Sequence, residues 1–172
     1  MKEFEIAEGG LKRVIAVRLH PGDDVLLSLE QLCREKNLKN GLILSAIGSL
    51  DGAAFYNPVE LPHKKAGYGY SEPVTLKGPI ELTNASGMIC HDTDGNILLH
   101  VHISLSDRYG NAHGGHLIEG NKVLLTVDMI LGEVEGIDMG RGYDEALEVP
   151  LFAPRQLSLI HISEPTRLAL IS

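Results

Sequence analysis

The alternating run Leu99-His100-Val101-His102-Ile103 is the feature of this sequence that most constrains the fold. Successive side chains of a β-strand point to opposite faces, so the three apolar residues share one face and the two histidines share the other. The run therefore predicts a half-buried strand whose apolar side faces a core. On its other side, His100 and His102 would project next to each other as a pair of imidazoles.

A third histidine follows after a polar turn, in the segment Asn111-Ala112-His113-Gly114-Gly115-His116. The paired glycines allow the backbone to bend back closely, which would bring His116 beside His100 and His102. Three neutral imidazoles that leave a fourth position open are the ligand set of catalytic zinc, and they also suit iron, nickel or copper. Histidines on one strand face can also be ordinary solvent-facing residues, and this alternative stays open.

Three polar residues near this group are candidates for a supporting role. Asp107, His113 and Glu119 could provide a fourth ligand, orient a ligand from behind, or act as a general base. The simpler readings are a turn-capping aspartate, a surface histidine and a solvated glutamate.

The rest of the chain reads as one helix among several strands. Helical spacing of apolar residues begins after Asp23 and Asp24, either of which could cap the helix, and it ends within residues 37–41. Apolar or alternating runs predict strands, and the segment rich in proline and glycine between them predicts a long surface loop at residues 58–79. The predicted strands cover residues 12–19, 41–50, 80–89, 97–104 and 123–133. This order favours an α+β domain with a largely antiparallel sheet.

Composition limits the classes of function. The chain has 172 residues, 44% of them hydrophobic, which suits a single domain with a real core. A formal net charge of -8 and the absence of a long basic run disfavour nonspecific binding to DNA phosphates. The sequence also lacks a membrane-length apolar segment and the layout of a signal peptide, so we expect a cytoplasmic protein. Cys33 and Cys90 are expected to be buried free thiols.

The C-terminal segment is interpreted as non-native. Residues 157–167, LSLIHISEPTR, resemble the translation of a sequencing-library transposase adapter. We therefore assign the domain to residues 1–155, treat residues 156–172 as a tail that replaces the natural C-terminus, and leave His161 out of the metal-site argument.

The order of these features resembles the PPC domain (plants and prokaryotes conserved domain). The segments that carry the resemblance are RVIAVRLHPGDDVLLSLEQLC, GLILSAIGSLDGAAF and LHVHISLSDRYGNAHGGHLIEGNKVLLTVDMILGEV. The resemblance implies a compact α+β homotrimer with the strand-borne histidines near subunit contacts. It also implies a metal held by His100, His102 and His116. Plant members add AT-hooks and bind DNA, whereas Gly140-Arg141-Gly142 here lacks the proline that an AT-hook requires.

Two hypotheses follow. The first is a cytoplasmic, homotrimeric PPC-domain protein that binds a divalent metal, with zinc expected and iron or nickel as alternatives, and with DNA binding or regulation attached by resemblance alone. The second is a metal-dependent enzyme that acts on a small molecule through the three-histidine site, with Asp107 or Glu119 as the proton carrier. The sequence leaves the choice between them open.

Overall fold

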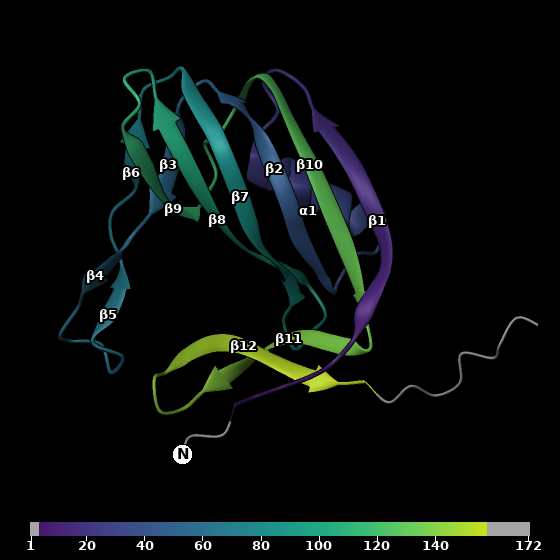
Figure 1. Ribbon diagram of the computed structural model, residues 1–172. Helices are drawn as coiled ribbons and strands as arrows, with labels where there is room; N and C mark the ends of the chain where they lie inside the picture. The colour runs from purple at the N-terminus through teal and green to yellow at the C-terminus, as the bar shows by residue number, and fades with distance from the viewer. Residues whose placement is uncertain (1–3, 158–172) are drawn as a thin grey trace, which may run out of the picture.

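The computed structural model describes residues 4–157, which form one large twisted sheet with a helix on one face and a hairpin across one end (Figure 1). The helix α1 spans Val25–Glu35. The strands in chain order are β1 (Gly10–Leu19), β2 (Gly41–Leu50), β3 (Ala53–Tyr56), β4 (Pro58–Glu60), β5 (Tyr68–Tyr70), β6 (Val74–Leu76), β7 (Ile80–His91), β8 (Ile97–Asp107), β9 (Ala112–Leu117), β10 (Val123–Glu135), β11 (Ile137–Asp144) and β12 (Val149–Gln156).

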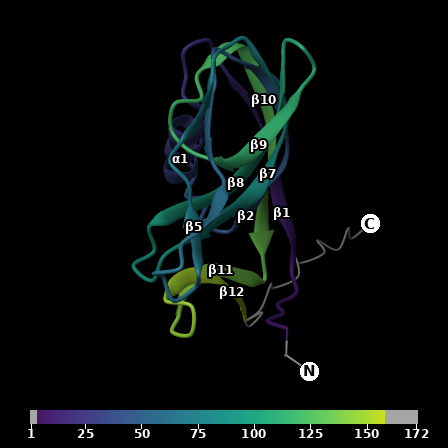
Figure 2. The same ribbon diagram turned by 90° about the vertical axis from the view of Figure 1, so that its left-hand side faces the viewer.

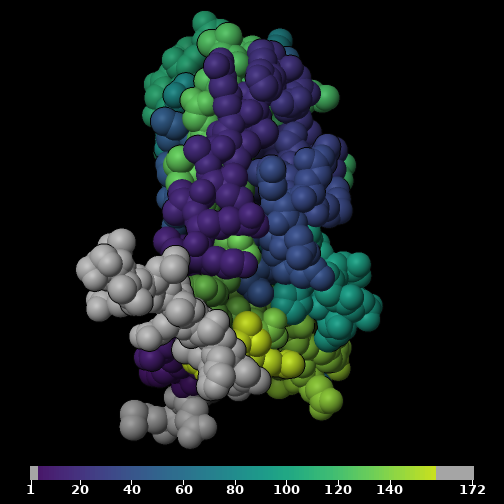
Figure 3. Space-filling model, turned by 90° about the vertical axis from the view of Figure 1, so that its right-hand side faces the viewer, coloured from purple at the N-terminus to yellow at the C-terminus, as the bar shows by residue number. Residues whose placement is uncertain are grey.

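The main sheet has the strand order β1-β10-β2-β7-β8-β9-β3-β6, and all of these neighbours are antiparallel. Strand β1 is one edge strand of this sheet, and the N-terminal part of the chain that contains it forms the band of purple atoms in Figure 3. The hairpin β11–β12 joins the sheet through a single parallel pairing of Gly140 with His91. The predicted α+β class with a mostly antiparallel sheet is therefore confirmed.

The helix begins where the sequence suggested. The side chain of Asp24 accepts hydrogen bonds from the backbone N–H groups of Leu26 and Leu27, which satisfies donors that the first turn leaves free. The helix buries Val25, Leu29 and Cys33 against one face of the sheet, and Figure 2 shows it to one side of the strands. One face of the sheet is thus covered.

The core lies between α1 and this covered face. The strands contribute alternate residues to it, among them Val101 and Ile103 of β8 and Val127, Met129 and Leu131 of β10. Cys33 and Cys90 are both buried and unpaired, as expected. Burial raises the pKa of the Cys33 thiol to about 12, so this thiol stays protonated and unreactive at neutral pH.

The buried side chain of Asn121 links several elements on the side of the sheet that α1 covers. Asn121 is fully buried, and its side chain accepts a hydrogen bond from the N–H of Ala54 and donates to the carbonyl oxygens of Ala54 and Ile118. Its own carbonyl accepts from the N–H of Val25 at the start of α1. One residue therefore connects strand β3, the segment after β9 and the helix.

Three parts of the sequence prediction need correction or extension. Residues 58–79 are not one loop, because they contain the strands β4, β5 and β6. The β4–β5 hairpin contacts the β11–β12 turn through an ion pair between Lys65 and Glu148, whose Nζ and Oε1 atoms are 3.2 Å apart. Strands β3, β9, β11 and β12 were also not among the predicted strands. Of the predicted tail, only Gln156 and Leu157 lie within the described residues, and Gln156 ends β12. In the described part of the chain, no helix is long and apolar enough to cross a membrane.

Candidate metal centre

Two adjacent antiparallel strands bring the three histidines together. On β8, Val101 and Ile103 point into the core, which directs His100 and His102 to the face opposite the helix. Strand β9 pairs with β8 so that His116 lies directly opposite His102. The chain reverses between Asp107 and Asn111, where Gly110 has a positive φ of 82°.

The paired glycines act differently from the expected bend. Gly114 and Gly115 lie inside β9 and allow its neighbours to approach closely. A Cβ on Gly114 would lie 2.3 Å from the carbonyl oxygen of Ile103, and one on Gly115 would lie 2.4 Å from that of Tyr56. Neither distance is compatible with a side chain, so glycine is required at both positions.

The imidazoles form a compact triangle. One ring nitrogen from each of His100, His102 and His116 lies within 4.8 Å of the other two. The ring centroids are 5.2 to 5.4 Å apart, and the Nε2 atoms of His100 and His102 are separated by 3.2 Å. No other group of three histidine, cysteine, aspartate or glutamate side chains within residues 4–157 meets the same distance condition.

The surroundings favour uncharged rings. Burial lowers the pKa of His116 to about 4, with further contributions from the nearby charges of His100, His102 and Arg141. The pKa of His100 is also lowered, mainly by burial and then by His102 and Arg141. At neutral pH these rings are unprotonated, and each therefore presents a lone pair of the kind that a metal ion requires.

A tyrosine from the β4–β5 hairpin supports the group. The hydroxyl of Tyr70 lies 3.3 Å from Nδ1 of His116, and the two rings are 4.9 Å apart. Tyr70 stacks in turn on Tyr56, at a centroid distance of 5.5 Å. This contact leaves Nε2 of His116 as the nitrogen free to face the other two rings. The sequence did not indicate Tyr70, because the contact depends on a hairpin in the segment interpreted as a loop.

The supporting residues expected from the sequence separate into two groups. Asp107 and His113 bond to each other, with 3.1 Å between Oδ2 and Nε2. The Asp107 carboxylate also accepts from Asn111 and from the backbone N–H of Tyr109, so it stabilises the β8–β9 turn. His113 lies an odd number of positions before His116 and pairs with the buried Leu105, which places it on the opposite face of β9.

Glu119, unlike Asp107 and His113, lies in the wall of a cavity that His116 also lines. It lines a cavity of about 530 Å³ together with His116, Glu30 and Tyr56. The other walls of this cavity are mostly leucine and isoleucine side chains from α1, β8 and the end of β9. One of the candidate ligands therefore borders a cavity that presents two carboxylates beside its leucine and isoleucine walls.

The face of the main sheet opposite α1, called the open face here, carries different kinds of side chain over its two halves. Over β1, β10 and β2 it exposes apolar side chains, with Val14 58%, Leu44 45%, Ile47 53% and Ile130 37% exposed. Over β8 and β9 the same face carries the three histidines. An apolar area of this kind on a folded domain is typical of an interaction surface.

The chain matches a known family and several known proteins. The model of the Plants and Prokaryotes Conserved (PCC) domain matches residues 6–135. Among curated proteins, the bifunctional protein GlmU of Synechococcus sp. (strain JA-3-3Ab) is 32% identical over 124 residues, which is 72% of this chain and 18% of that protein. GlmU of strain JA-2-3B'a(2-13) is 30% identical over 137 residues, 80% of this chain and 19% of that protein. This chain thus spans about a fifth of the length of the curated relatives it matches.

Solved structures share the fold. A metal-containing protein from Archaeoglobus fulgidus is 24% identical with a TM-score of 0.72, covering 87% of this chain and 99% of that one. A plant- and prokaryote-conserved (PPC) protein from Pyrococcus horikoshii is 26% identical with a TM-score of 0.68, covering 84% and 94%. A conjectured DNA-binding protein from Ralstonia eutropha JMP134 is 25% identical with a TM-score of 0.66, covering 80% and 88%.

Proposed function

The chain belongs to the Plants and Prokaryotes Conserved (PCC, or PPC) domain family, and from this premise we propose that it is a metal-binding member of the family. In this proposal His100, His102 and His116 hold one divalent ion, with zinc as the expected metal. The observation that carries the proposal is the convergence of the three ring nitrogens within 4.8 Å.

The spacing of the nitrogens suits zinc. Zn–N bonds of about 2.0–2.1 Å in a tetrahedral site place two ligands roughly 3.3 Å apart. The Nε2 atoms of His100 and His102 are already 3.2 Å apart, and the third ring nitrogen, from His116, lies within 4.8 Å of the nitrogens of the other two. Iron or nickel would also accept imidazoles, so the donor set favours zinc without requiring it. The Archaeoglobus protein is described as metal-containing, but this description applies to that protein alone. A likeness at 24% identity shows that the two chains share a fold.

Self-association belongs to the same proposal. The exposed apolar side chains over β1, β10 and β2 would be covered if several copies met through this face, and a homotrimer is the assembly expected from the sequence resemblance. Because the histidines share this face, the metal centre would lie at or near the contact between subunits. The cytoplasmic location expected from the sequence stays a prediction.

A second candidate function is a metal-dependent enzyme, which the cavity beside His116 favours. An ion held there would polarise a carbonyl group or activate water. Glu119 in the cavity wall would carry the proton, and the leucine and isoleucine walls would select a small molecule with an apolar part.

A DNA partner has weaker support. It rests on the names of relatives such as the Ralstonia protein. The net charge of -8 opposes it, because affinity for DNA phosphates depends on lysine and arginine.

Metal analysis of the purified protein tests the proposal. We expect about one equivalent of metal per chain, and its loss in His102→Ala. His63→Ala is the matched control, since His63 is an exposed histidine on the β4–β5 hairpin, outside the cluster. Lack of stoichiometric metal in the unmutated protein, or full retention in His102→Ala, would contradict the proposal.

A further inference from the structure

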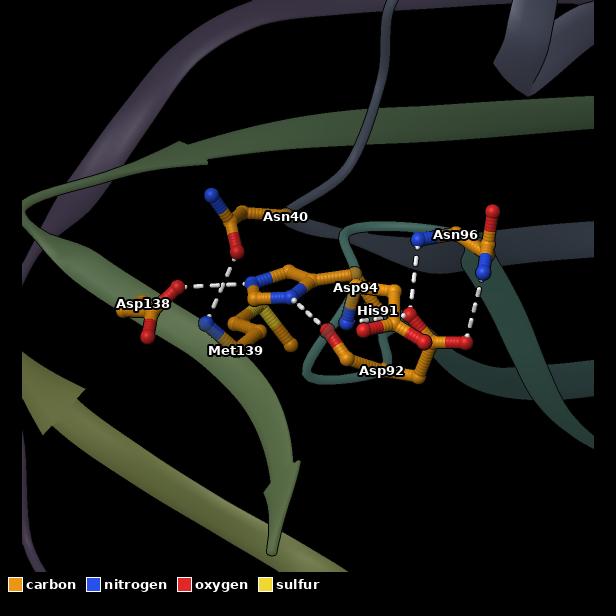
Figure 4. Close-up of polar contacts among 7 residues, drawn as sticks. All are labelled: Asn40, His91, Asp92, Asp94, Asn96, Asp138 and Met139. Carbon is orange, nitrogen blue, oxygen red and sulfur yellow. Dashed lines mark hydrogen bonds and ion pairs between the residues drawn. The ribbon is translucent and has the colours of Figure 1, made fainter.

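The β11–β12 hairpin is joined to the end of the sheet by two polar contacts (Figure 4). Oδ1 of Asp138 lies 2.6 Å from Nε2 of His91, the last residue of β7. The backbone N–H of Met139 donates to Oδ1 of Asn40, just before β2, over 2.7 Å. His91, although close in sequence to His100, therefore holds this hairpin and is not a member of the three-histidine group.

Two residues after Met139, Arg141 lies on the face of the hairpin that is turned toward the rest of the domain. Successive residues of a strand alternate between its faces, so Arg141 shares a face with Met139, which is only 4% exposed. Arg155 pairs with Asp138, lies on the opposite face and is exposed. The match to the family model ends at residue 135, before this hairpin begins. Arg141 is therefore outside the part of the chain that the family model describes.

The guanidinium group of Arg141 lies near the three histidines. The pKa of His116 is lowered chiefly by burial, then by the charges of His100 and His102, and also by that of Arg141. Arg141 contributes likewise to the lowered pKa of His100, after burial and His102. Because the Coulomb interaction weakens with distance, this effect on two of the rings places the positive charge of Arg141 beside the group.

Most of the hydrogen-bonding capacity of Arg141 is unused. Nη2 donates to the carbonyl oxygen of Pro150 over 2.8 Å, which holds the side chain along the hairpin. A guanidinium has five N–H donors, and within residues 4–157 the other four have no protein partner. No carboxylate of the same residues forms an ion pair with Arg141. A positive charge with free donors thus borders the three-histidine group.

This charge opposes the binding of a metal ion alone. Like charges repel, so a guanidinium beside a divalent ion raises the energy of the ion. Three neutral imidazoles offset none of the ion's charge, and no carboxylate among the described residues belongs to the group. An anion that contacted both the ion and Arg141 would replace the repulsion with two attractions. The site therefore suits a negatively charged ligand.

Building on the proposed metal site, on which this inference depends, we propose that the metal centre binds the carboxylate group of a small organic acid. One carboxylate oxygen would occupy the position of the ion that the histidines leave open, and the other would accept hydrogen bonds from Arg141. The two oxygens of a carboxylate match one ion and one guanidinium. A phosphate monoester would bring a third oxygen and a second negative charge beyond these two contacts.

Acetate is the probe for this site, and acetamide is an uncharged control of similar size. We expect calorimetry to give a Kd of about 10 mM or below for acetate and the zinc-loaded chain. Acetamide with the zinc-loaded chain, and acetate with the metal-free chain, should each bind at least about tenfold more weakly. Equal binding in either comparison would overturn the proposal. Tighter binding of methyl phosphate than of acetate would overturn the assignment to a carboxylate.

A variant of Arg141 separates its role at the ligand from a role in folding. Arg141→Gln should weaken acetate binding by about tenfold, because it removes a charge-assisted contact. Zinc affinity measured without acetate should stay the same or rise in this variant, because a like charge beside the ion is removed. Arg155→Gln, on the opposite face of the hairpin, is the matched control and should bind acetate and zinc normally. Undiminished acetate binding in Arg141→Gln, or weaker zinc binding without acetate, would contradict the proposal.

Zinc content and acetate binding separate this inference from the proposed function. A purified chain without stoichiometric zinc would overturn both. A chain that holds one zinc ion, loses it in His102→Ala and does not bind acetate would overturn the carboxylate ligand alone and leave the metal site standing.

Discussion

The hydroxyl of Tyr70 lies 3.3 Å from Nδ1 of His116 and joins the β4–β5 hairpin to the three-histidine group. If Nε2 of His116 binds the metal, Nδ1 carries the proton and donates it to the Tyr70 oxygen. The phenol would then fix both the tautomer and the orientation of the ring.

Removing this hydroxyl should therefore weaken metal binding. We expect Tyr70→Phe to lower zinc affinity by about tenfold, the lower end of what supporting groups around metal ligands contribute. Competition with a chromophoric chelator measures the change. Tyr68→Phe, on the same hairpin but without a hydrogen bond to a histidine among the described residues, should bind zinc normally. Equal affinities for the two variants would show that the contact has no role in holding the ion.

The metal-free protein should lose stability as the pH falls from 6.5 to about 4. In the folded chain the pKa of His116 is lowered from 6.5 to about 4, chiefly by burial. In this window the unfolded chain binds a proton that the folded chain does not, so the free energy of unfolding falls with pH. Urea denaturation at several pH values measures this. The loss should be smaller in His116→Gln, and an identical loss in that variant would contradict the assignment.

The apolar side of the open sheet face should control assembly. Ile47 and Ile130 are 53% and 37% exposed, so lysine at either position is tolerated in a single chain but leaves a buried charge at an interface. We expect the unmutated protein to sediment as a trimer and Ile47→Lys combined with Ile130→Lys to sediment as a monomer. Leu27→Lys on the exposed side of α1 is the control. A monomeric unmutated protein would remove the basis for assembly through this face.

The buried amide of Asn121 should be among the most sensitive positions for stability. Asn121→Ala leaves the N–H and C=O of Ala54 without their partner in a site closed to water. Each unsatisfied buried group costs about 1–3 kcal/mol, so we expect the free energy of unfolding to drop by at least about 2 kcal/mol. Denaturant titration gives the value. Asn96→Ala in the exposed β7–β8 turn should cost clearly less, and a reversed order would be inconsistent with this role.

Periodicity made the central strands and the helix predictable. Asp24 was one of two expected helix caps, and the alternation from Leu99 to Ile103 gave the correct face for His100 and His102. These signals are strong because each segment buries one side, so its sequence repeats with the period of its own backbone.

The other strands have no such signal. Strands β4, β5 and β6 have three residues each and are mostly exposed, which leaves no alternation to detect. Strand β12 contains Pro150 and Pro154, residues that the middle of a sheet excludes but an edge strand tolerates. Without these strands the sequence could not place Tyr70 beside His116, or His91 opposite Asp138.

The three histidines of the candidate site could be grouped from the sequence, but the strand pairing that brings them together could not be predicted. The family resemblance supplied the reason to join His116 to the other two histidines, and strand pairing supplies the physical cause. Asp107 and His113 could not be separated from the site by sequence, because their mutual bond depends on the shape of the turn.

The pairing of His102 with His116 also means that the ligand set depends on how the two strands are aligned. A shift of β9 by one residue along β8 would turn His116 toward the core and remove it from the triangle. A one-residue insertion or deletion that moved β9 along β8 would therefore be more damaging to the site than a substitution at an exposed turn residue such as Arg108. The metal content of a preparation would accordingly report the fraction of molecules that have folded with the correct alignment.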